Sequence, residues 1–169
     1  KDLGIAPMGL EALDMVRIEA GLIFYGFEFD DQTDPFEAGI GFSVALKTKE
    51  DNFVGKEALI TADKKCKTWG IRIKDGIALK GNSLKIKEEN VGKVTSSTWS
   101  PYQVCGVGIV HMNKEDLGPG NIVEVACVDG KIRKGELCEL PMYDAKGEIV
   151  RGINKEIPLD PSPWKGLSK

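Results

Sequence analysis

The sequence predicts an α+β fold, in which a helical N-terminal part is followed by an antiparallel β-barrel. Apolar residues recur at helical spacing over residues 9–20. Beyond residue 65 the chain becomes a series of short apolar runs separated by Gly, Pro, Asn and Asp. Short strands at such close spacing are typical of small antiparallel barrels and sandwiches. We therefore expect one barrel or sandwich over residues 67–152, with the helix outside it.

The N-terminal helix is predicted from the apolar stripe of Leu10, Leu13 and Val16. Gly21 follows the last periodic residues, and glycine at this position commonly ends a helix. The apolar and aromatic run between Gly21 and Gly26 is then expected to form a short buried segment.

Three further elements are expected before the barrel. Residues 28–35 form an acidic loop, residues 41–46 read as a strand, and residues 55–61 read as a short helix. The charged run at 62–67 separates these elements from the strand-rich part. We place the boundary inside this run, near residue 65.

Turn residues separate the predicted strands. Asp129 and Gly130 form a hairpin signal, and residues 144–147 are a candidate for a second turn. Residues 95–98 read as a loop cluster, in which the hydroxyls of Thr95 and Ser97 bind the loop's own backbone. The strand-like runs are 69–73, 84–86, 91–95, 104–111, 122–128 and 132–137, with a further candidate at 148–151.

Three parts of the chain follow from these boundaries. Residues 1–65 end one domain, residues 66–152 form the barrel domain, and residues 153–169 form an extended, Pro-rich tail. Lys1 opens the chain and is followed almost at once by a helix. We therefore expect the chain to be a fragment of a longer polypeptide.

The composition argues against two classes of partner. The 169 residues carry a formal net charge of −3, with Lys and Arg spread along the chain. No basic tract is dense enough to follow a nucleic acid. No apolar run approaches the roughly 20 residues of a membrane helix, and no signal peptide opens the chain. We expect neither a nucleic acid nor a membrane as partner.

The four cysteines are scattered, and His111 is the single histidine. Cys66, Cys105, Cys127 and Cys138 contain no C-x-x-C pair, so no zinc-ligand set is apparent. Such cysteines are usually buried thiols of a protein in a reducing compartment. We therefore expect a cytoplasmic protein without a metal. A catalytic thiolate would need a base, and His111 reads as a strand residue instead.

Five segments have amino-acid sequences that are more specific than a periodic apolar pattern alone would require. They are GLEALDMVRIEAG at 9–21, DPFEAGIGF at 34–42, NFVGKEAL at 52–59, VGKVTSSTWSP at 91–101 and LPM at 140–142. In this order and spacing they resemble the aminomethyltransferases of the glycine-cleavage T-protein family and the folate-dependent demethylases of the same superfamily. The resemblance covers roughly residues 9–143.

The resemblance implies the end of a folate-binding domain followed by a C-terminal β-barrel. It implies an enzyme that passes a one-carbon unit from an aminomethyl-lipoyl carrier protein to tetrahydrofolate. One alternative is a demethylase of a small methylated compound such as sarcosine, dimethylglycine or a sulfonium compound. Another is a non-catalytic folate-binding paralogue. The implied partners are the folate, the donor, a lipoyl carrier protein and the N-terminal half of the same protein.

The candidate site residues follow from what a folate needs. Its pterin needs polar partners, its benzoyl ring apolar walls, and its glutamate tail cations or backbone donors. The candidates are Leu13, Arg17, Glu19, Leu22, Tyr25, Trp99 and Tyr143. We name no catalytic residue, because the carboxylate that the family uses to orient the reacting folate has no match here. We expect the chain alone to be inactive.

Two candidates depart from the family pattern. The resembling aminomethyltransferases carry a ligand-contacting Arg where this chain has Leu13, and many carry Tyr where it has Leu22. Loss of a charge-assisted contact is worth about 1.5–3 kcal/mol. The amino-acid sequence around Leu13 is more similar to that of the demethylases.

Alternatives remain open at three candidates. Arg17 fits a structural salt bridge as well as a ligand contact. Glu19 lies in the last helical turn, against the helix dipole, so we expect it to have a specific partner, either a backbone amide or one of the neighbours of Arg17 across the domain junction. Trp99 fits either a lid over a ligand or a plug of the core.

Overall fold

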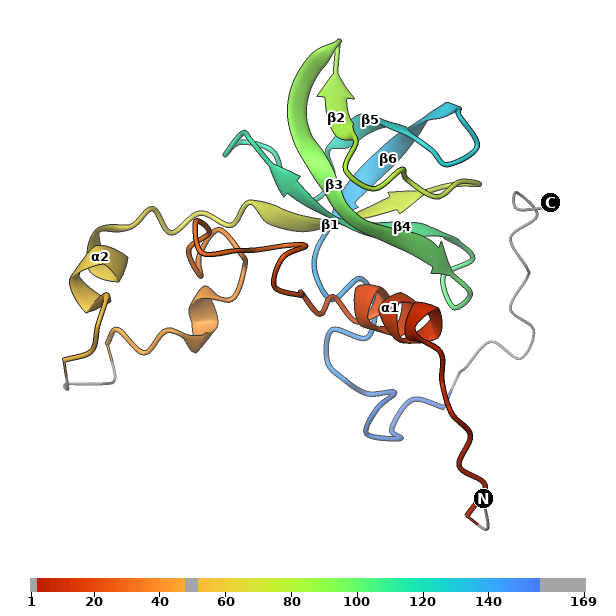
Figure 1. Ribbon diagram of the computed structural model, residues 1–169, viewed down its shortest axis with the longest axis horizontal. Coiled ribbons are helices and arrows are strands. Elements are labelled where there is room, and N and C mark those ends of the chain that lie inside the picture. Colours follow the sequence, from red (N-terminus) through yellow and green to blue (C-terminus); the bar gives the residue numbers. More distant parts are fainter. Residues whose placement is uncertain (1–2, 48–51, 156–169) are drawn as a thin grey trace.

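A closed antiparallel β-barrel forms the centre of the molecule in the computed structural model, which describes residues 3–47 and 52–155 (Figure 1). Its strand order is β1-β4-β3-β2-β5-β6, and every neighbouring pair is antiparallel. The strands are β1 (Thr68–Ile73), β2 (Ser83–Ile86), β3 (Glu89–Ser100), β4 (Cys105–Met112), β5 (Ile122–Ala126) and β6 (Ile132–Cys138). The predicted fold class is confirmed.

Strand alternation separates an inner from an outer face of the barrel. The interior is filled by branched aliphatic side chains, among them Ile71, Leu84 and Val110. Alternate residues of β4, Val107 and Ile109, point outward and are nevertheless buried. A second apolar layer must therefore cover the outside of this strand.

The helix α1 (Leu10–Glu19) forms part of that second layer, on the outer face of β3 and β4 (Figure 1). Ile18 of α1 is fully buried against Val107 and Ile109. Gly21 follows the end of the helix, and its φ of 69° turns the chain so that the N–H of Leu22 bonds the carbonyl of Arg17 at 2.8 Å. A side chain at Gly21 would press on the backbone of Pro141, 3.0 Å away. The predicted helix and its end are confirmed.

The apolar stripe of α1 faces away from the barrel. Leu10, Leu13 and Val16 are 84%, 41% and 52% exposed, whereas Arg17 is buried. The face turned to the barrel is thus set by Arg17 and Ile18. The stripe from which the helix was predicted is left for another contact.

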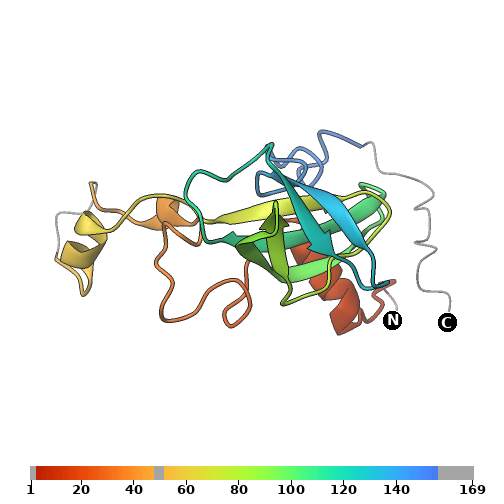
Figure 2. The same ribbon diagram turned by 90° about the horizontal axis from the view of Figure 1, so that it is seen from above.

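Residues 30–67 extend away from the barrel as an arm (Figures 1 and 2). The arm carries a 3₁₀ turn, Gly41–Ser43, and the short helix α2 (Lys56–Thr61). The predicted strand at 41–46 is wrong. The N–H groups of Ser43 and Val44 bond carbonyls three residues back, and no described strand lies alongside to pair with this run.

The segment after β6 crosses the outside of the barrel and carries Met142 into the second apolar layer. The strand candidate at 148–151 is wrong. The Asp144 carboxylate accepts the N–H groups of Glu148 and Ile149, so these donors close a local turn. The predicted tail lies, from residue 156 onward, outside the described residues. No helix in the described ranges is long and apolar enough to cross a membrane.

Candidate ligand site at the helix–barrel junction

Arg17 connects α1, the loop that follows it and the barrel. Its Nε donates to Asp14 at 2.7 Å, Nη1 to the Glu28 carboxylate at 2.8 Å, and Nη2 to Ser96 Oγ at 2.7 Å. The side chains of Arg17 and Glu28 are 4% and 0% exposed. The structural salt bridge, one of the two roles left open by the sequence, is therefore present.

Glu28 is the acceptor at the centre of this network. It receives the N–H of Phe24 at 2.8 Å and the hydroxyls of Thr95 and Ser96. A buried carboxylate is tolerated only when its lone pairs are satisfied in this way. The network pins the loop 24–28 to β3.

The expected loop at 95–98 is wrong, because these residues belong to β3. Thr95 Oγ1 lies within hydrogen-bond distance of both the Glu28 carboxylate and the carbonyl of Ile109, which share its single proton, and Ser97 Oγ donates to the carbonyl of Ala78 at 2.7 Å. Both hydroxyls bond other segments rather than their own backbone. A run of Thr and Ser suits a strand when its hydroxyls find partners across the sheet.

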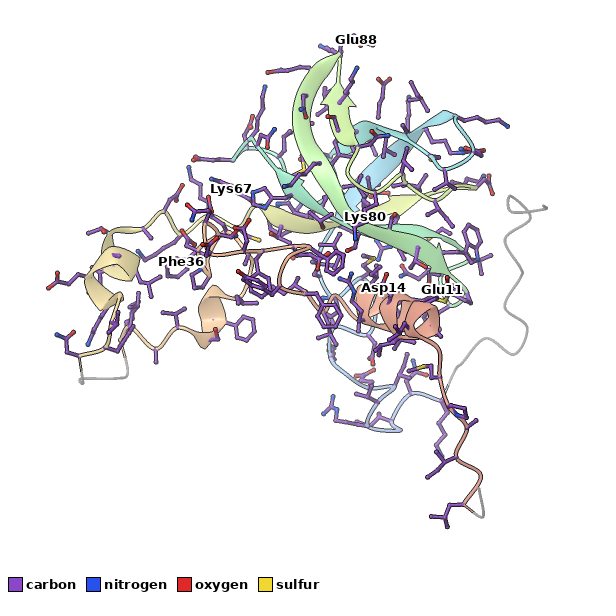
Figure 3. All side chains as sticks on the ribbon, viewed as in Figure 1. Glu11, Asp14, Phe36, Lys67, Lys80 and Glu88 are labelled. Atoms are coloured by element: carbon purple, nitrogen blue, oxygen red, sulfur yellow. The ribbon has the colours of Figure 1, made fainter. Side chains whose placement is uncertain are left out.

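The pinned loop presents aromatic rings at the surface. Phe24 and Phe27 are half-exposed, and the Arg17 guanidinium lies 5.1 Å from the Phe24 ring centre. Lys80, on the barrel side of the junction in Figure 3, places its ammonium 3.6 Å from the centre of Phe27. Tyr25 packs edge-on against Phe29. The junction is thus an aromatic surface fixed by cations.

A second polar cluster surrounds the last turn of α1. Ser100 Oγ donates to the buried Glu19 carboxylate and accepts the N–H of Gln103 at 2.9 Å. Glu19 therefore has the specific partner that its position predicted. This partner is the hydroxyl of Ser100 in the barrel, which is not a backbone amide and differs from the groups that bond Arg17.

Tyr143 stacks on Tyr102 close to this cluster, with ring centres 4.3 Å apart and planes at 22°. Burial, reinforced by the charge of Glu19, raises the pKa of the Tyr143 phenol. Tyr143 is therefore neutral at physiological pH and able to donate a hydrogen bond. The predicted residues Glu19 and Tyr143 lie in one neighbourhood.

Six of the seven candidate residues divide into two groups and one outlier, and the seventh, Leu13, lies on the outward stripe of α1. Arg17, Leu22 and Tyr25 belong to α1 and the loop that it pins, whereas Trp99 faces Gly106 on the inner side of β3. Strand alternation turns Trp99 away from Ser100 and α1. This orientation favours the plug over the lid, and its ligand contact stays a prediction.

Sequence reasoning missed the residues that hold this site together. Glu28 was assigned only to an acidic loop, while Arg72 and Gln103 were not considered. The partners that join Glu28 and Arg72 to other elements lie between 11 and 70 positions away in sequence, beyond the reach of helical or strand periodicity. The only signal available for Glu28 was its position, as the first acidic residue after the aromatic run between Gly21 and Gly26.

Comparison with known proteins identifies the relationship. Residues 1–48 match the family described as "GCVT N-terminal domain", and residues 67–144 match "Glycine cleavage T-protein C-terminal barrel domain". The aminomethyltransferase of Prochlorococcus marinus is 35% identical over 83% of this chain and 38% of its own length. The chain belongs to the glycine-cleavage T-protein family. It corresponds to the C-terminal portion of the proteins in this family.

Other members of the T-protein family agree with this placement. The aminomethyltransferase of Listeria monocytogenes serotype 4b (strain F2365) is 40% identical over 83% of the chain and 39% of its own length. The trimethylamine-oxide aldolase of Ruegeria pomeroyi is 46% identical over 75% of the chain and 16% of its own length. The chain thus spans well under half the length of these curated relatives.

A solved T-protein structure has the same fold. The crystal structure of the glycine cleavage system aminomethyltransferase T from Bartonella henselae superposes with a TM-score of 0.68 at 24% identity. The match covers 81% of this chain and 39% of that one. At this identity the likeness shows the fold.

A cleft of about 560 Å³ opens at the end of α1 in this T-protein family member. The end of α1, the arm, the start of β1 and residues 139–141 meet around it, and Leu22, Phe42 and Trp69 are among its apolar walls. Glu139 and Thr68 contribute the polar groups. Clefts of this volume suit small molecules.

The cysteines are free thiols in the described part of the chain. Burial raises the pKa values of Cys66 and Cys105, and that of Cys138 to about 11. Burial also lowers the pKa of His111, so its ring is mostly neutral at pH 7. No group of three metal-ligating side chains occurs within the described ranges.

Cys138 is expected to resist alkylation at neutral pH. Only the thiolate is nucleophilic, and burial keeps the pKa of this thiol at about 11. Iodoacetamide labelling of Cys138, followed by peptide mass spectrometry, should accelerate about tenfold per pH unit between pH 8 and 10. Full labelling at pH 7 within the time that the urea-unfolded chain needs would contradict the expectation.

Proposed function

We propose that the protein is part of a tetrahydrofolate-dependent enzyme that moves a one-carbon unit onto the folate. One observation carries this proposal. The Arg17–Glu28 ion pair, at 2.8 Å and fully buried, fixes an aromatic surface at the junction of α1 and the barrel. A cleft of about 560 Å³ opens at the end of the same helix, and a rigid aromatic surface and a cleft of this volume suit a flat, partly apolar ligand.

The residues present fit a folate in their chemistry. The aromatic surface and Leu22 supply apolar walls, while Glu19 and the neutral phenol of Tyr143 supply polar partners. In this proposal Leu13, Leu22 and Tyr25 contact the ligand, and Arg17 supports the wall. The chain's own task is to bind and orient, which lowers the entropic cost of reaction. Proton transfer would be carried out by a part of the enzyme outside this chain.

The one-carbon donor in the first form of the proposal is an aminomethyl-lipoyl carrier protein. A small methylated amine is the second candidate, and two observations favour it. The trimethylamine-oxide aldolase of Ruegeria pomeroyi shares 46% identity with this chain. Leu13 also stands where the resembling aminomethyltransferases carry a cation.

The proposal includes an upstream half of the same polypeptide as partner, with residues 1–65 completing its domain and residues 66–152 forming the barrel domain. The outward stripe of α1 and Phe42, which is 90% exposed, supply apolar surface for such a contact. The free thiols suit a reducing compartment, so we propose a cytoplasmic location. The chain alone should not turn over substrate.

Thermal melts of the longer polypeptide test the folate site. Tetrahydrofolate at 100 times its dissociation constant should add about 2.7 kcal/mol to the free energy of unfolding. Turnover with trimethylamine oxide, dimethylglycine or an aminomethylated lipoyl protein then distinguishes the donors. An unchanged melting temperature at millimolar tetrahydrofolate would contradict the proposal.

Leu13→Arg is expected to tighten the binding of tetrahydrofolate. A cation at this partly exposed position would offer the glutamate tail a charge-assisted bond, worth about 1.5–3 kcal/mol. Calorimetric titration should therefore show a dissociation constant at least about tenfold lower. Leu10→Arg, on the same exposed stripe one turn earlier, is the matched control. Equal affinities in all three proteins would show that the glutamate tail does not reach α1.

A further inference from the structure

Arg72 lies on the outer face of β1 and links two segments that have no other described hydrogen bond between them. Its Nε donates to Gln103 Oε1 at 2.7 Å, in the turn between β3 and β4. Its Nη2 donates to the carbonyl of Met142, in the segment after β6. The planar guanidinium is suited to such a double contact, because its donors are held in a fixed fork.

Each of the two segments carries one ring of the tyrosine pair. Tyr102 precedes Gln103, and Tyr143 follows Met142. The rings are stacked with centres 4.3 Å apart. The Arg72 bonds therefore hold the Gln103 side chain beside one ring and the Met142 backbone beside the other, and with them the separation of the rings.

The turn that carries Tyr102 is held in an unfavourable backbone conformation. Val104 has a φ of 54°, in the left-handed region that β-branched residues rarely adopt. Such a conformation persists only where the surroundings impose it. The bonds of Gln103 to Arg72 and to Ser100 provide that constraint.

The same bonds continue to the end of α1. Gln103 donates its backbone N–H to Ser100 Oγ, and Ser100 donates to the buried carboxylate of Glu19. Gln103 Nε2 is buried without an acceptor in the described part of the chain. Leaving a buried donor unpaired costs about 1–3 kcal/mol. Its oxygen, by contrast, is committed to Arg72.

We propose that Arg72 and Gln103 are positioning residues that hold the Tyr102–Tyr143 pair at the end of α1 as one aromatic wall of the ligand site. The ligand part rests on the proposed function. Neither residue touches the ligand, and both act through the spacing of the two rings. Among the described hydrogen bonds, only those of Arg72 join the turn to the segment after β6, so we expect its loss to separate the rings.

Two measurements test the positioning role. In the 169-residue chain, Arg72→Met should abolish the tyrosine signal of the near-UV circular dichroism that Tyr143→Ala also removes. In the longer polypeptide, Arg72→Met and Tyr143→Ala should each raise the dissociation constant of tetrahydrofolate about tenfold. The variant that carries both changes should bind tetrahydrofolate as tightly as either single variant. Additive losses in the double variant would overturn the proposal.

Three further variants separate positioning from charge and from stability. Arg72→Lys keeps the charge but cannot span both acceptors, so it should behave as Arg72→Met; full rescue by lysine would overturn the proposal. Arg133→Met, which breaks an ion pair with Asp129 at the far turn, should leave both signals unchanged. Gln103→Met should reproduce the loss of the tyrosine signal, and an unchanged signal would likewise overturn it.

The two proposals fail in different ways. If the wild-type polypeptide does not bind tetrahydrofolate, the proposed function is wrong, and the near-UV signal still decides whether Arg72 positions the rings. If tetrahydrofolate binds but Arg72→Met changes neither affinity nor the tyrosine signal, the positioning role is wrong and the proposed function stands.

Discussion

Glu28→Ala is expected to lower the free energy of unfolding by about 3–5 kcal/mol. The change removes the acceptor for Arg17, Ser96, Thr95 and the N–H of Phe24 in one step. The guanidinium of Arg17 is then left buried with only the half-exposed Asp14 as counter-charge. An uncompensated buried charge costs far more than the net worth of the pair.

Urea unfolding followed by circular dichroism measures this loss. Glu89→Ala is the matched control, because it breaks an exposed pair with Lys114 of 2.7 Å and should cost less than about 1 kcal/mol. Replacing Arg17 and Glu28 together by Met should cost less than the sum of the single changes, since no charge stays unpaired. A loss below about 1 kcal/mol for Glu28→Ala would refute the network's role.

Gly106→Ala is expected to destabilise the barrel by about 1–3 kcal/mol or more. A Cβ at Gly106 would lie 1.7 Å from the carbonyl oxygen of Gly76, a distance at which two atoms overlap. The backbone after β1 would have to move, together with Ala78, whose carbonyl accepts the Ser97 hydroxyl. Neither segment is a flexible side chain that gives way easily.

Differential scanning calorimetry tests this expectation. In a chain of this size each kcal/mol lowers the melting temperature by about 2–4 °C. Gly118→Ala is the control, because its Cβ would meet only the Trp69 ring at 3.6 Å, an ordinary contact, and its effect should stay within about 0.5 kcal/mol. Equal melting temperatures for the two variants would contradict the close approach seen at Gly106.

Local patterns sufficed for α1 and for the presence of six strands, although residues 95–98 of β3 were predicted as a loop. The glycine after α1 marks its end, and each strand appears as a short apolar run between turn residues, so both signals are contained in a few neighbouring residues. The same reasoning failed at residues 41–46 and 148–151. An apolar or alternating run becomes a strand only if a partner lies alongside, and neither run has one in the described structure.

The candidate site shows the same division. Arg17, Glu19 and Tyr143 were predicted, but not the groups that they contact. Glu28 and Ser96 meet Arg17 across 11 and 79 positions of sequence. No periodicity reports on contacts of such separation.

The sequence by itself determined the family, the α+β class and the order of helix and strands, because these depend on local patterns and on short sequence motifs. Only the tertiary structure decided which face of α1 meets the barrel. The apolar stripe of Leu10, Leu13 and Val16 predicted one face, and the buried Arg17 and Ile18 occupy the other. The physical reason is that a charged side chain is buried only where distant groups satisfy every donor, and the fold alone brings Glu28 and Ser96 to Arg17.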